Sequence, residues 1–235
     1  MSNDNVALTD EDWSQFACHV VDAAMKGNRE LAVDIAVIAI GHESFQSTFA
    51  ERIKEMMSNY VLSERKAEEG IVELIALLLI TKWPREHARC GLESNAILFS
   101  IISSIKGWLM AVIGETDEVE EVESSCACAL YEVCRYAQRK MWMNWPELVD
   151  ECYDAAGDAL TSNITLSKEA RKALLDALIM IQGWTSRNAK TLVNVSTQTE
   201  ARKALLDALI MIQGWTSRNA KTLVNVSTQT YKTRI

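Results

Sequence analysis

Residues 95–114 read NAILFSIISSIKGWLMAVIG and form the most apolar stretch of the chain. As a helix this stretch is about 30 Å long, the thickness of a bilayer core. It also carries three serines, one lysine and two glycines, so the apolar run is not continuous. In an acidic chain without a second such segment, this pattern favours the central helix of an all-α core over a membrane helix. We therefore predict an all-α fold, a single globular bundle of about eight to ten helices around residues 95–114.

Helical patterns continue upstream of this stretch. The chain holds two prolines and nine glycines, and this scarcity of helix-breaking residues favours long helices. Thr9 and Asp12 have the spacing of a capping box, which predicts the start of the first helix. Its apolar residues recur every three or four positions and are expected to face the core: Trp13, Phe16, Ala17, Val20, Val21 and Ala24.

Downstream of the apolar stretch, residues 115–123 hold six acidic residues in nine positions. We interpret this run as the acidic first turns of a helix whose later turns carry Arg135, Arg139 and Lys140, the order that the helix dipole favours. Pro146 is suited to the first position of the next helix.

The C-terminal third of the chain contains an exact tandem duplication. Residues Glu169–Thr199 read EARKALLDALIMIQGWTSRNAKTLVNVSTQT, and Glu200–Thr230 repeat all 31 letters; we call them copy 1 and copy 2. Perfect identity indicates a recent or engineered event. We predict that Ser167 caps a helix in copy 1 and that Gly183 ends it.

We expect the fold to contain one groove into which the helix of the repeat docks, and this groove has room for only one copy. We predict that copy 1 occupies it, and that copy 2 either extends from the fold or mediates self-association. The expected organisation is an all-helical domain over residues 1–199, with residues 200–235 forming the second copy and a short tail.

Charge is distributed unevenly along the chain. The net charge is −8; residues 166–235 carry +7 and residues 1–165 carry −15. An acidic body argues against nucleic acid as a partner. The N-terminus is acidic and lacks the pattern of a signal peptide, so we expect a cytoplasmic protein whose six cysteines are reduced.

No catalytic or cofactor motif occurs in the sequence, and we expect no catalytic residue, cofactor or metal. His87 with Cys90 and Cys126 with Cys128 are the nearest approach to a zinc ligand set. Neither pair has CxxC spacing, and residues two apart on a helix face different directions. An enzyme with dispersed catalytic residues stays open as an alternative.

Two short patterns near the C-terminus resemble peptide ligands. Thr197, Gln198 and Thr199 recur as Thr228, Gln229 and Thr230, and this Thr-Gln-Thr core resembles the anchor of peptides that add a strand to the dynein light chain. Thr233 and Ile235 resemble the end of a class I ligand of PDZ domains. The resemblance implies a dynein-light-chain-like or PDZ-like protein partner.

Together these features favour a non-enzymatic helical interaction or regulatory protein whose C-terminal segment carries the contacts. A self-assembling structural protein, including a viral one, is the alternative from another class. In that case residues 95–114 or the duplicated helix mediate oligomer or membrane contact, although membrane contact is the less favoured of the two.

Overall fold

The computed structural model describes residues 8–62, 69–114 and 120–186, and these ranges are built from helices joined by short turns. The α-helices are α1 (Asp10–Met25), α2 (Arg29–Ala39), α3 (Glu43–Leu62), α4 (Glu69–Ile80), α5 (Ala96–Ile113), α6 (Glu120–Ala137), α7 (Arg139–Asn144), α8 (Pro146–Ser162) and α9 (Lys168–Ser186). Two 3-10 helices, η2 (Arg85–His87) and η3 (Arg89–Ser94), join α4 to α5. The prediction of an all-α bundle is confirmed.

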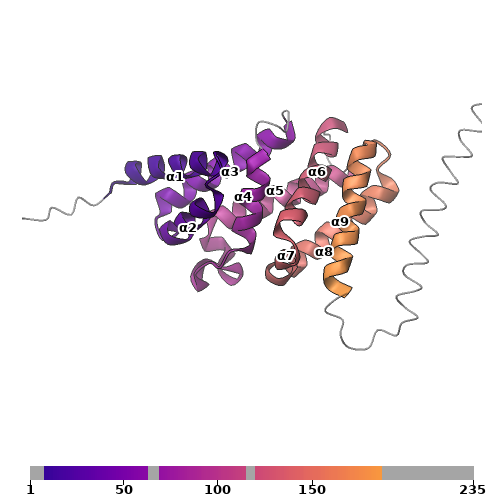
Figure 1. Ribbon diagram of the computed structural model, residues 1–235. Helices are drawn as coiled ribbons and strands as arrows, with labels where there is room; N and C mark the ends of the chain where they lie inside the picture. Colours follow the sequence, from indigo (N-terminus) through magenta and orange to yellow (C-terminus); the bar gives the residue numbers. More distant parts are fainter. Residues whose placement is uncertain (1–7, 63–68, 115–119, 187–235) are drawn as a thin grey trace, which may run out of the picture. The chain divides into compact units, whose positions relative to one another are not determined.

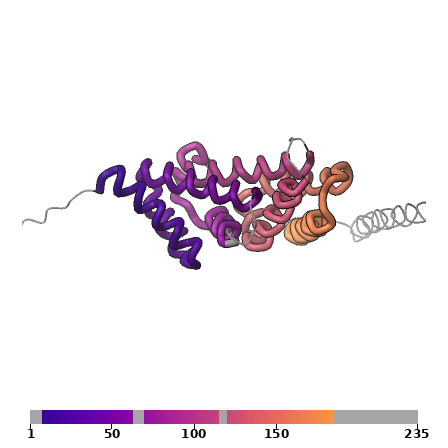
Figure 2. The backbone as a smooth tube through the Cα atoms, turned by 90° about the horizontal axis from the view of Figure 1, so that it is seen from above, coloured from indigo at the N-terminus to yellow at the C-terminus, as the bar shows by residue number. Residues whose placement is uncertain are grey.

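From α1 to α6 the helices pack mainly against the next helix but one, and α5 then packs against α8. One row of contacts joins α1 to α3, α3 to α5 and α5 to α8, and another joins α2 to α4 and α4 to α6. From α1 to α9 the helices follow one another in chain order (Figures 1 and 2). Successive stacking of helices along the chain is typical of helical-repeat proteins.

Helix α5 lies at the centre of this arrangement, packed against α3, α6 and α8. Its apolar face is buried, whereas Phe99 and Met110 are exposed on the opposite face and Lys106 pairs with Glu151 of α8 at 2.9 Å. Asn95 caps its first turn by accepting a hydrogen bond from the Leu98 amide at 3.0 Å. Within the described ranges α5 alone is long and apolar enough to cross a membrane, and half of it is buried by neighbouring helices.

The predicted start of the first helix is confirmed. The Asp12 amide donates to the Thr9 hydroxyl at 3.2 Å, and the Thr9 amide donates to the Asp12 carboxylate at 2.8 Å. The predicted inward stripe is wrong at Phe16, which is 40% exposed. Phe16 lies at the edge of the interface between α1 and α3, where its ring contacts Trp13 and Phe45 and stays partly open to solvent.

The predicted continuation of one helix through Arg139 and Lys140 is wrong. Helix α6 ends at Ala137, Gln138 has a φ of +55°, and a separate helix, α7, begins at Arg139. The change of direction turns Trp145 into the core, where its indole N–H donates to the Leu79 carbonyl at 2.8 Å. This contact joins residues 66 positions apart, so local sequence carries no signal of it.

Residues 169–186 of copy 1 lie in α9, and Ser167 caps this helix as predicted, accepting a hydrogen bond from the Ala170 amide at 3.1 Å. The prediction that Gly183 ends the helix is wrong, since α9 continues to Ser186. Trp184 is buried on the same face as Ile181, three residues earlier, so packing favours continuation through the glycine. Copy 2 lies outside the described residues.

By contacts between Cα atoms the chain divides into two units, residues 1–185 and 186–235. The predicted domain boundary after residue 199 falls outside the described residues.

Candidate functional site

The groove between α6 and α9, called here the α6–α9 groove, is the best candidate for a binding site. Its volume is about 580 Å³. On both walls the lining residues recur every three or four positions, the spacing of one helix face. Lining residues come from α6 (Cys128, Tyr131, Glu132, Arg135 and Tyr136), from α9 (Glu169, Lys172, Ala173 and Asp176), and from Tyr60 of α3 and Val72 of α4.

Arg135 is held in place on the α6 wall of this groove. Its guanidinium lies 4.5 Å from the centre of the Tyr136 ring and pairs with the Glu132 carboxylate at 2.6 Å. The hydrogen bond that Arg135 donates to the Glu132 carboxylate raises the pKa of Arg135 above its ordinary value, so the group stays charged. Tyrosine and arginine dominate the binding energy of many protein interfaces, and their presence here suits the groove to binding a polypeptide.

The α9 wall adds charges of both signs to the groove. Glu169 and Lys172 are exposed, and Asp176 is partly exposed. A binding partner therefore meets tyrosine rings on one side and a mixed-charge helix on the other. Such a surface fits a polypeptide better than a small molecule, because it is open and offers contacts along two helices.

A second cavity of about 600 Å³ lies where the end of α4 meets α7. Trp83 and Trp145 line it, but both indole N–H groups already donate, to the Leu78 and Leu79 carbonyls at 2.9 and 2.8 Å. Lys82, Arg89 and Lys140 also line it, and Arg89 pairs with Glu147. The cavity is thus a local basic surface on an acidic body.

A smaller apolar groove of about 190 Å³ lies between α1 and α2. Its lining includes Phe16 and Leu31, which are 40% and 59% exposed. Ile38, further along α2, is 83% exposed. Helix α2 therefore presents apolar side chains outward at the beginning of the helical rows.

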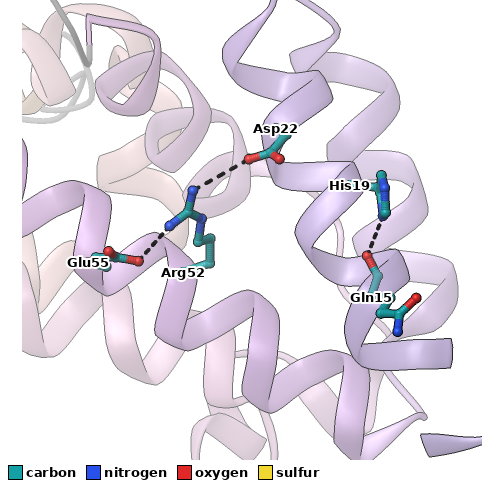
Figure 3. Close-up of polar contacts among 5 residues, drawn as sticks. All are labelled: Gln15, His19, Asp22, Arg52 and Glu55. Atoms are coloured by element: carbon teal, nitrogen blue, oxygen red, sulfur yellow. Dashed lines mark hydrogen bonds and ion pairs between the residues drawn. The ribbon is translucent and has the colours of Figure 1, made fainter. Parts of the chain in front are cut away.

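The polar clusters outside these grooves stabilise the fold locally. Figure 3 shows Arg52 of α3 between Asp22 of α1, at 3.6 Å, and Glu55, at 2.7 Å. In the same view His19 contacts the main-chain oxygen of Gln15, at 2.7 Å. Each contact joins neighbouring turns or adjacent helices, so these groups stabilise the packing of the helices.

His87 and Ser94 are the nearest approach to a nucleophile with a base. The His87 Nδ1 lies 2.8 Å from the Ser94 carbonyl, which only accepts, so this nitrogen carries the proton. The Ser94 hydroxyl lies 3.2 Å from the same nitrogen, but it donates its proton to the main-chain carbonyls of Glu86 and Gly91 and can only accept from a protonated Nδ1. The pair thus lacks the hydrogen bond that activates a serine nucleophile.

The cysteines considered as zinc ligands are not brought together as one set. Cys126 is buried in the core, Cys128 lines the α6–α9 groove, and Cys90 is exposed on η3. The described ranges contain no group of three His, Cys, Asp or Glu side chains that could hold a metal ion.

The predicted partner-binding residues all lie outside the described residues: Thr197, Gln198, Thr199, Thr228, Gln229, Thr230, Thr233 and Ile235. The sequence analysis missed the α6–α9 groove. Tyr131 and Arg135 are spaced four apart on the polar face of α6, which was the available signal.

Comparison with known proteins gives one match. Residues 1–192 match the family described as a repeat of unknown function (DUF7627), a range that covers α1 to α9. No curated protein and no solved structure matches the chain.

Proposed function

We propose that this chain, a member of the family described as a repeat of unknown function (DUF7627), is a helical-repeat scaffold that binds another protein and catalyses no reaction. Two observations of the fold support a scaffold. From α1 to α6 the helices pack mainly against the next helix but one, an arrangement found in helical-repeat proteins. The groove between α6 and α9 is open.

The α6–α9 groove carries this proposal. It joins tyrosines and a fixed guanidinium on α6 to a charged face of α9, which are the residue types that anchor protein partners. The proposed ligand is a polypeptide segment with both apolar and charged side chains, because the groove offers aromatic rings and charges of both signs.

A pair of matched tyrosine variants tests the proposal. Tyr136 lines the groove on α6 and is 38% exposed, whereas Tyr153 on α8 lies outside the groove and is 37% exposed. We expect Tyr136→Ala to weaken capture of a specific protein from cell extract by about tenfold, the effect of losing an interface anchor. Tyr153→Ala should leave the same capture unchanged.

The readout is quantitative mass spectrometry of captured proteins, followed by a Kd measurement with the purified partner. Both variants must have the same circular dichroism spectrum and the same thermal unfolding midpoint as the unchanged protein. Equal loss of capture in the two variants, or no loss in either, contradicts binding through the α6–α9 groove.

The C-terminal Thr-Gln-Thr segments extend this proposal to a named class of partner. Two identical segments on one chain suit a dimeric partner such as the dynein light chain, because linkage raises avidity. A binding assay with purified light chain tests this: joint substitution of Gln198 and Gln229 by Ala should abolish binding, while each single substitution leaves a weaker complex.

Self-assembly is the second candidate function. It is supported by Ile38 on α2 and Ile179 on α9, which are 83% and 55% exposed near the two ends of the helical rows. Terminal repeats of helical-repeat proteins normally present polar residues outward. Light scattering at several concentrations distinguishes the candidates, because a monomer at every concentration contradicts self-assembly.

A further inference from the structure

The site that α9 occupies is defined by six buried side chains of copy 1. They recur on one face of the helix and belong to the core of the fold. They are Ala170, Ala173, Leu174, Ala177, Ile181 and Trp184. None of the six is more than 8% exposed, so this face fits its site closely.

Copy 2 repeats that face without a difference. Its counterparts, 31 positions further on, are Ala201, Ala204, Leu205, Ala208, Ile212 and Trp215. We propose that copy 2 is a second ligand for the α9 site of its own chain, so that two helices of the same sequence exchange in one site. Side-chain packing cannot favour either copy, because the docked residues are identical.

The segment before α9 is what favours copy 1. Its contacts with α6 anchor it: the Ser167 amide donates to the Ser124 hydroxyl at 3.2 Å, and the Thr165 hydroxyl donates to Glu123 at 2.7 Å. Copy 1 follows this anchor directly, and Arg171 donates to the carbonyl of Leu166 at 3.2 Å. These contacts hold the segment before α9 on α6, and they hold the first turn of α9 against that segment.

Copy 2 reaches the same site only by forming a loop. With the anchor in place, docking copy 2 leaves the 31 residues of copy 1 between the anchor and the docked helix. Closing such a loop disfavours the state by on the order of 100-fold. Copy 2 therefore occupies the site in about one molecule in a hundred, and becomes the main occupant when copy 1 is weakened by more than that factor.

Exchange within the chain is favoured over exchange between chains. A tethered helix has an effective concentration in the millimolar range, far above that of a second molecule at micromolar protein. The inference does not depend on the proposed protein partner. Docked copy 2 would place Lys203 and Asp207 where Lys172 and Asp176 line the α6–α9 groove.

Three variants of the full chain test this inference by urea unfolding. Leu174→Asp places a charge on the buried face of copy 1, Leu205→Asp does the same in copy 2, and the third variant combines them. We expect Leu205→Asp to unfold like the unchanged protein. Leu174→Asp should lower the folding equilibrium constant about 100-fold, the effect of the loop. The double variant should lose at least another 100-fold, because it has no intact helix left.

Hydrogen exchange identifies which helix is docked. The substitution itself gives peptides spanning positions 174 and 205 different masses, although the copies are otherwise identical. In Leu174→Asp we expect protection around position 205 and its loss around position 174. Equal destabilisation in Leu174→Asp and the double variant, with no protection around position 205, overturns the inference.

Deletion of residues 200–230 in the Leu174→Asp background is the matched control. It removes the spare helix, so its stability should fall to that of the double variant. Light scattering of Leu174→Asp should give a monomer at every concentration. A dimer that dissociates on dilution would instead show docking between chains and overturn exchange within one chain.

Discussion

Substitution of Asn163 by Ala should weaken the connection of the α8–α9 turn to α5 and α6. Asn163 lies between α8 and α9 and is 8% exposed. Its amide nitrogen donates to the Val112 carbonyl in α5 at 2.9 Å and to the Glu123 carboxylate in α6 at 3.1 Å. Its amide oxygen accepts from the Thr165 amide at 3.0 Å. One side chain thus connects three segments, α5, α6 and the turn between α8 and α9.

The size of the effect follows from these bonds. A buried hydrogen bond between neutral groups contributes about 1 kcal/mol, and one to a carboxylate contributes about 1.5–3 kcal/mol. Alanine removes both donated bonds and leaves the Val112 carbonyl without this partner. We expect Asn163→Ala to lower the free energy of unfolding by about 3–4 kcal/mol.

Urea unfolding followed by tryptophan fluorescence measures this loss. Asn28→Ala is the control: Asn28 is an exposed residue before α2 whose side chain makes no capping hydrogen bond, so its loss should stay below about 0.5 kcal/mol. A double-mutant cycle of Asn163→Ala with Glu123→Gln isolates the bond between them. A loss below about 1 kcal/mol for Asn163→Ala would refute the role assigned to it.

Two further predictions concern titrating groups. Burial raises the pKa of the Cys134 thiol to about 12, so a thiol reagent at pH 8 should label exposed Cys90 rapidly and Cys134 only on unfolding; equal rates in the folded protein would contradict this. Hydrogen bonds from the Thr9 hydroxyl and amide hold the pKa of the Asp12 carboxyl group below 3.8. The capping box therefore stabilises the fold fully above pH 3.8. This contribution is lost as the pH falls through the lowered pKa of Asp12. NMR titration of the carboxyl group should show this low pKa, and Thr9→Ala should move it back towards 3.8.

Local signals in the sequence were sufficient to predict several elements. The Thr9 capping box, the Asn95–Gly114 limits of α5, the start of α8 at Pro146 and the Ser167 cap all depend on residues within one turn of each other. Such features are visible in the sequence because their hydrogen bonds and backbone angles are set by near neighbours.

The errors occurred where distant contacts outweigh local preference. At Gln138 the chain leaves the helical path, and Trp145 enters the core to donate to Leu79. At Gly183 the helix continues, because Trp184 is buried beside Ile181. A glycine inside a helix destabilises it by about 1 kcal/mol relative to alanine. Burying a large apolar side chain stabilises the fold by about 1.5–3 kcal/mol, so packing outweighs the local preference at these positions.

The sequence by itself determined that this protein is helical, that residues 95–114 form a long apolar helix, and that the sequence of one amphipathic helix occurs twice. Only the tertiary structure decided that the helices from α1 to α6 pack mainly against the next but one, and that α6 and α9 face each other across a groove lined by tyrosines. Helical periodicity fixes which side chains share a face. Which two faces meet depends on the packing of residues far apart in the chain, and no local pattern encodes it.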